Sequence, residues 1–115
     1  MNFDDAIRAH AAWKMRLSNY IRNPDGTLNP AEVAPDNQCS LGQWIYENLT
    51  QYGTMSEFNE LKTIHANFHR CAADIVERAD KGENLSDEVA LGTNSQYASL
   101  SADVVSHIMA LKKKV

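Results

Sequence analysis

The feature that most constrains the fold is an apolar seam in the segment that begins at Ser56. Its inward positions recur alternately three and four residues apart, which is the spacing of a helix face in a bundle. Glycine often closes a helix, and the pattern ends at Lys81 and Gly82. The seam positions are Phe58, Leu61, His65, Phe68, Ala72, Ile75 and Ala79. The spacing therefore predicts one long helix over residues 56–81, with a histidine on its buried face.

Two further segments carry the apolar spacing of long helices. Asn2 is a suitable N-terminal cap for a first helix that runs to about Arg22. Ser86, followed by acidic residues, can cap a final helix that continues to the C-terminus, with residues 92–95 as its weak stretch. We therefore expect three long helices in all.

The middle of the chain shows no long helical pattern. Prolines and an Asn-Pro-Asp-Gly turn predict one long irregular loop over residues 23–38. A short amphipathic helix is expected over residues 40–49. Gly42 lies inside that helix, where glycine costs about 1 kcal/mol relative to alanine. We expect another backbone to approach closely at this position.

No segment shows the alternating pattern of a β-strand, and no internal repeat occurs. The sequence therefore predicts an all-α protein, an antiparallel four-helix bundle of three long helices and one short helix. A chain of 115 residues can bury one core, and we expect a single domain over residues 1–115.

Charge and hydropathy argue against two classes of partner. The net charge of −4, from 11 Lys and Arg against 15 Asp and Glu, provides no basic surface for nucleic acid. No apolar run approaches the roughly 20 residues that span a bilayer, and the first residues lack a signal-peptide stretch. We expect a cytoplasmic protein that binds neither nucleic acid nor membranes. Its two cysteines should then not form a disulfide.

Four side chains form a candidate metal site. His65 and His69 lie four residues apart in the predicted long helix, so their imidazoles share a face and can chelate one ion. His10 lies on the apolar stripe of the first helix, although a hydrogen-bonded core histidine is the plainer interpretation of it alone. Cys39 precedes the short helix, where helix amides favour the thiolate that binds metal. Three imidazoles and one thiolate would complete the closed tetrahedral shell that Zn²⁺ prefers.

Two other potential ligands are less well placed. Cys71 is two residues beyond His69, about 200° around the helix, so it faces away from the site. We expect it to be a small apolar filler or a partly exposed thiol. His107 lies beside the apolar stripe of the final helix and is the rival ligand, but it has no companion at helical spacing.

Two catalytic interpretations have little support. A zinc peptidase helix requires His-Glu-x-x-His, in which the glutamate is the general base, and Ala66 occupies the place of that glutamate. A di-iron bundle requires carboxylates that project inwards, whereas the acidic residues of the long helix lie off its seam. We therefore predict that the protein is not an enzyme.

Three motifs resemble those of a known family in their order and separation. The family is the chemoreceptor zinc-binding (CZB) domain. The motifs are Ala9-His10-Ala11-Ala12-Trp13, Cys39-Ser40-Leu41-Gly42-Gln43-Trp44 and His65-Ala66-Asn67-Phe68-His69.

The resemblance implies a helical bundle, commonly a homodimer, with one zinc ion held by His10, Cys39, His65 and His69. It implies a bacterial cytoplasmic sensor of zinc availability, or of oxidants that act at the zinc-bound cysteine. Members are usually attached to chemoreceptor signalling regions or to diguanylate cyclases, so a chemotaxis or cyclic-di-GMP signalling partner is expected. Two other functions remain open: a non-sensory helical interaction bundle and, less well supported, a metalloenzyme with an open metal site.

Overall fold

The computed structural model describes residues 2–115, apart from the side chain of Asp87. Three long helices form its body: α1 (Phe3–Arg22), α5 (Ser56–Asp80) and α7 (Gln96–Lys112). Four short helices accompany them: α2 (Pro30–Val33), α3 (Ser40–Glu47), α4 (Leu49–Tyr52) and α6 (Asp87–Ala90). No strand occurs in the described part of the chain, so the predicted all-α class is confirmed.

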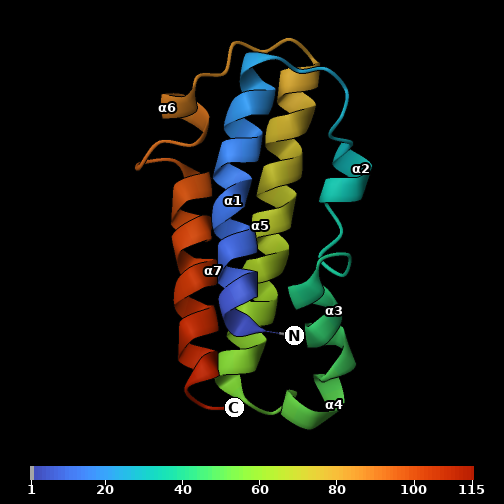
Figure 1. Cartoon of the computed structure of the whole chain (residues 1–115), viewed down its shortest axis with the longest axis vertical. Helices are drawn as coiled ribbons and strands as arrows, with labels where there is room; N and C mark the ends of the chain where they lie inside the picture. Colours follow the sequence, from blue (N-terminus) through green and yellow to red (C-terminus); the bar gives the residue numbers. More distant parts are fainter. Residues whose placement is uncertain (1) are drawn as a thin grey trace.

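The long helices lie side by side, and α5 contacts both α1 and α7 (Figure 1). Helices α1 and α5 run in the same direction, and α7 runs in the opposite one (Figure 1). The segment from α2 to α4 descends beside α5 and takes the place of a fourth helix. The chain therefore alternates in direction as a four-helix bundle does, but its fourth member is broken into short pieces.

Side-chain caps explain where two of the three long helices, α1 and α7, begin. The Asn2 side chain accepts hydrogen bonds from the backbone amides of Asp4 and Asp5. The Ser95 hydroxyl accepts one from the backbone amide of Ala98, at the start of α7. Just beyond the end of α5, Gly82 adopts a φ of +81°, a conformation that glycine reaches without strain. The predicted bounds of the first helix and of the longest helix are confirmed to within about one residue.

Two sequence expectations are wrong in detail. The loop over residues 23–38 is not irregular throughout, because Pro30 begins α2 and the Asn29 side chain caps it. The expected final helix is also interrupted. The Ser86 hydroxyl does accept a hydrogen bond from the Val89 amide, but α6 ends at Ala90 and a new helix starts after Ser95. A second cap in the weak stretch of residues 92–95 separates the two helices.

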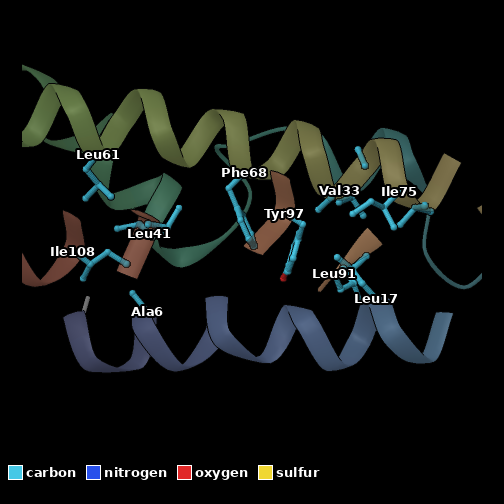
Figure 2. Close-up of a cluster of buried hydrophobic side chains, with 14 of the residues drawn as sticks. Ala6, Leu17, Val33, Leu41, Leu61, Phe68, Ile75, Leu91, Tyr97 and Ile108 are labelled. Carbon is cyan, nitrogen blue, oxygen red and sulfur yellow. The ribbon is translucent and has the colours of Figure 1, made fainter. Parts of the chain in front are cut away.

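The core lies between the three long helices (Figure 2). Phe68 and Tyr97 occupy its middle, with Leu61 and Ile108 towards one end and Leu17 towards the other. Every seam position of α5 is buried, with an exposed fraction of at most 4%. The predicted seam is therefore confirmed. None of the helices in the described residues combines the length and hydropathy that crossing a membrane requires.

Candidate metal centre

Four potential ligands from three separate elements converge at one point of the bundle. His10 comes from α1, Cys39 from the residue just before α3, and His65 and His69 from successive turns of α5. One donor atom of each side chain lies within 4.8 Å of the donor atoms of the other three. We call these four residues the metal centre. The structure thus brings together all four residues that the sequence singled out.

The Nε2 atom of His65 lies in the middle of the donor set. It is 3.1 Å from Nε2 of His10, 3.0 Å from Nε2 of His69 and 3.2 Å from Sγ of Cys39. The Cys39 sulfur is 3.6 Å from Nε2 of His69. In a tetrahedral zinc site, with Zn–N of about 2.0–2.1 Å and Zn–S of about 2.3 Å, neighbouring ligand atoms are about 3.3–3.6 Å apart. These four distances are close to those of a tetrahedral shell, and all six donor distances are within 4.8 Å.

Two of the imidazole rings are oriented by backbone carbonyl groups. Nδ1 of His10 lies 2.7 Å from the carbonyl oxygen of Ala6, one turn earlier in α1. Nδ1 of His69 lies 2.9 Å from the carbonyl oxygen of Val33, the last residue of α2. A carbonyl oxygen only accepts hydrogen bonds, so each Nδ1 carries the proton and donates it. The Nε2 atom of each ring is then unprotonated, and its lone pair is directed towards the other donor atoms of the metal centre.

These proton positions leave a conflict that a cation would resolve. The lone pairs of His10, His69 and Cys39 all face Nε2 of His65, which can donate one proton at most. Acceptor lone pairs that face one another in a core without a shared proton or cation are costly. Nδ1 of His65 is buried without a hydrogen-bond partner among the described residues, and a metal on Nε2 would not change that. One divalent ion would accept all four lone pairs, so the donor set fits zinc.

Burial keeps the three imidazoles uncharged. It lowers the pKa of His65 to about 2, with further contributions from neighbouring His69 and His10. Burial also lowers the pKa of His10 and of His69, although the hydrogen bonds to Ala6 and Val33 partly oppose this effect. At neutral pH the rings are therefore already in the form that binds a metal.

The Cys39 thiol behaves differently from the sequence expectation. Its sulfur accepts a hydrogen bond from the Gly42 amide at 3.4 Å, as a cap of α3. Burial nevertheless raises the pKa of the thiol, because the loss of solvation outweighs the amides of Gly42 and Leu41. The expectation that the helix start makes this thiol easy to ionise is therefore wrong for the metal-free site. A cation at the centre would supply the charge that the thiolate requires.

The predicted close approach at Gly42 is confirmed. A Cβ atom at this position would lie 1.8 Å from the carbonyl oxygen of Asp36. The Tyr46 hydroxyl, one turn further along α3, donates to the Asp36 carboxylate at 2.9 Å. The loop before α3 is therefore packed directly on that helix, which fixes where Cys39 begins it.

The two rejected ligands lie outside the metal centre. Cys71 is half-buried on another side of α5, in a pocket that it shares with Gln96 and Leu100. Nε2 of His107 is 3.7 Å from the Glu60 carboxylate, and its Nδ1 is 2.7 Å from the Asp103 carbonyl oxygen. Sequence reasoning missed the role of Val33 in orienting His69. The Asn29-Pro30 pair, a cap followed by a proline at the first helical position, is the signal that could have revealed α2.

An all-α bundle with three buried imidazoles and a cysteine thiol at one point defines a metal-binding helical domain. The chain belongs to the chemoreceptor zinc-binding domain family, whose model matches residues 10–76, more than half of the chain and all of the metal centre. It is therefore a zinc-binding domain, from a family of sensory and regulatory domains rather than of enzymes. Searches among curated proteins and among solved structures gave no match.

Proposed function

We propose that this chain is a single zinc-binding sensory domain over residues 1–115, with zinc held by Nε2 of His10, His65 and His69 and by Sγ of Cys39. The observation that carries the proposal is the convergence of these four donor atoms in a chain of the CZB family. Bound zinc supplies the positive charge that keeps the thiolate ionised and ties α1, α3 and α5 together. The domain would report to a chemoreceptor or diguanylate cyclase partner in chemotaxis or cyclic-di-GMP signalling.

A closed ligand shell supports a regulatory role over catalysis. Four protein donors complete the preferred coordination of zinc, whereas catalytic zinc sites keep one position for water or substrate. The three histidines have exposed fractions of at most 4%, which leaves little room for a substrate at their side of the ion. We therefore favour a sensor over a metalloenzyme with an open site.

Cys39 is the ligand best suited to respond to a signal. It lies outside the long helices and is half-buried, while the histidines are fixed by bundle packing. His10 and Cys39 line a cleft of about 740 Å³, which gives small molecules a route to the sulfur. Oxidation of the thiolate to a sulfenic acid, for example by a peroxide, would weaken its bond to zinc. Metal loss and oxidation would then be two inputs to one switch.

We also propose that the domain is a homodimer in the cytoplasm, where its two free cysteines would stay reduced. The face formed by α1 and α7 supports the dimer. Met109, which is 51% exposed, lines a groove of about 690 Å³ together with Ala98 and Ala102 of α7 and Lys14 of α1. Met15, the residue after Lys14, is 71% exposed. Exposed apolar surface of this kind is typical of protein interfaces.

The test of the proposed zinc site is a comparison of the two cysteines. Wild-type protein should contain about one zinc per chain by elemental analysis. Cys39→Ser should lower zinc affinity at least about 100-fold in a competition titration, because a direct ligand is lost and even outer partners cost 10- to 100-fold. Cys71→Ser should change it by less than about twofold.

Equal effects of the two substitutions would contradict the ligand assignment. Absence of stoichiometric zinc would instead favour a non-sensory interaction bundle. The coordination number has its own test in a cobalt-substituted sample, whose spectrum should be insensitive to azide if the shell is closed.

A further inference from the structure

Helix α3 joins the metal centre to a second cluster of side chains. Cys39 caps the start of this helix, and Trp44 lies five residues further on. The Trp44 ring is 5.2 Å from the Phe3 ring, 5.8 Å from the Tyr52 ring and 5.9 Å from the Phe58 ring, between ring centroids. We call Phe3, Trp44, Tyr52 and Phe58 the aromatic cluster.

The aromatic cluster draws its members from four different helices. Phe3 is the first residue of α1, Tyr52 is the last of α4, and Phe58 lies in the first turn of α5. Trp44 meets Phe3 and Phe58 edge to face, a geometry that contributes about 0.5–1.5 kcal/mol per pair beyond the area buried. The cluster therefore holds α3 against the ends of two long helices.

Helix α3 is short enough to move as one body. Its eight residues span about 12 Å at 1.5 Å per residue. Leu41 and Ile45 point from it into the core, and the Asp36 loop covers its outer side. Its aromatic contact with α1 is made by Trp44 on Phe3. This pair is therefore a direct contact between α3, which Cys39 begins, and the start of α1.

We propose that Trp44 is a positioning residue for Cys39, and that its contact with Phe3 couples the metal centre to the two ends of the chain. The proposal rests on the proposed zinc site. Asp4, next to Phe3, forms an ion pair of 2.9 Å with Lys112, the last residue of α7. The start of α1 and the end of α7 lie at the same end of the bundle (Figure 1). Because coupling free energies are reciprocal, a substitution at Phe3 should change the free energy of zinc binding by as much as zinc changes the stability cost of that substitution.

The first test uses Trp44 as its own reporter. The chain has two tryptophans, so Trp13→Phe leaves Trp44 as the sole tryptophan, whose emission can be excited selectively over that of the four tyrosines. In that protein, removal of zinc with a chelator should shift the emission maximum of Trp44, and added zinc should restore it. An emission spectrum that does not respond while zinc is bound and released would overturn the proposal.

The second test measures coupling in the same Trp13→Phe background. Phe3→Ala should lower zinc affinity about 3- to 10-fold, the range that one aromatic pair can supply. Ile21→Ala is the matched control, since Ile21 is another half-buried apolar residue of α1, at the end distant from Phe3. It should change zinc affinity by less than about twofold, even if the thermal midpoint falls equally in both variants.

A purely structural role for Phe3 would make zinc affinity follow stability in both variants, and that result would overturn the coupling. Trp44→Phe should retain more zinc affinity than Trp44→Ala, because a smaller ring still contacts Phe3. A wild-type chain that binds no zinc would overturn the proposed function and this inference together. Normal zinc binding with an unresponsive Trp44 overturns this inference alone.

Discussion

At the scale of single residues, the metal centre combines donors whose pKa values are shifted in opposite directions by burial. Burial lowers the pKa of His10, His65 and His69, so the three rings hold no extra proton at neutral pH. Burial raises the pKa of Cys39, so the thiol keeps its proton until a metal displaces it. Proton release on metal binding should therefore come from one residue.

We expect zinc binding near pH 7.5 to release about one proton per ion. The imidazoles are already neutral there, and the thiol is not yet ionised, so zinc affinity should rise about tenfold per pH unit from pH 6.5 upwards. Calorimetry in buffers of different ionisation enthalpy measures the number directly. Cys39→Ser should bring it close to zero, and a wild-type value of two or more would mean that the rings are charged before binding.

At the scale of the elements, the one-turn helix α2 has a role larger than its length suggests. Its last residue, Val33, presents the carbonyl oxygen that accepts the proton of Nδ1 of His69. The helix is held at its start by the Asn29 side chain, which accepts a hydrogen bond from the Ala31 amide. Pro30 occupies the first position of α2, where proline favours a helix. In the sequence alone, the same proline indicates irregular structure, because proline disrupts a helix at later positions.

Loss of the cap on α2 should weaken zinc binding without touching a ligand. Asn29→Ala is expected to cost about 1 kcal/mol of local helix stability and to lower zinc affinity about 3- to 10-fold, because Val33 then orients His69 less well. Glu32→Ala, at an exposed position of the same helix, is the control. If a competing chelator titration gave the same affinity for both variants, α2 would not orient the ligand.

At the scale of the whole molecule, the metal centre connects parts of the chain that are distant in sequence. Helices α1 and α5 pack against each other, and the broken segment from α2 to α4 reaches the site through Cys39 and Val33. On the opposite side, the α1 and α7 face exposes methionines that no described element covers. The metal centre thus lies on one side of the bundle, and the proposed contact with a second copy of the chain lies on the other.

We expect the wild-type chain of 12.9 kDa to sediment with twice that mass, through this α1 and α7 face. Met15→Glu combined with Met109→Glu should yield the single-chain mass, because two carboxylates would then be buried in the interface. Val89→Glu alters an equally exposed apolar residue on α6 and should leave the dimer intact. A monomeric wild-type protein at tens of micromolar would refute the proposed homodimer.

Much of this fold could be predicted from the local spacing of apolar residues in the sequence. The seam of α5 depends on side chains three and four residues apart, and the same spacing placed His65 and His69 on one face. Caps such as Asn2 act within one turn, so they too could be predicted from neighbouring residues. The break between α6 and α7 was the exception, since two competing caps, at Ser86 and Ser95, lie close together.

The sequence by itself determined the first and the longest helix, the apolar seam and the identity of four candidate metal donors. Only the tertiary structure decided that Val33 orients His69 and that the Asp36 carbonyl oxygen occupies the space that a Cβ atom at Gly42 would need. It also decided that His107 lies 3.7 Å from the Glu60 carboxylate and not at the metal centre. The contacts of Val33 with His69 and of Glu60 with His107 join residues far apart in the chain, and the geometry of all three contacts depends on how the elements pack. The raised pKa of Cys39 has the same origin, because burial is a property of the assembled bundle.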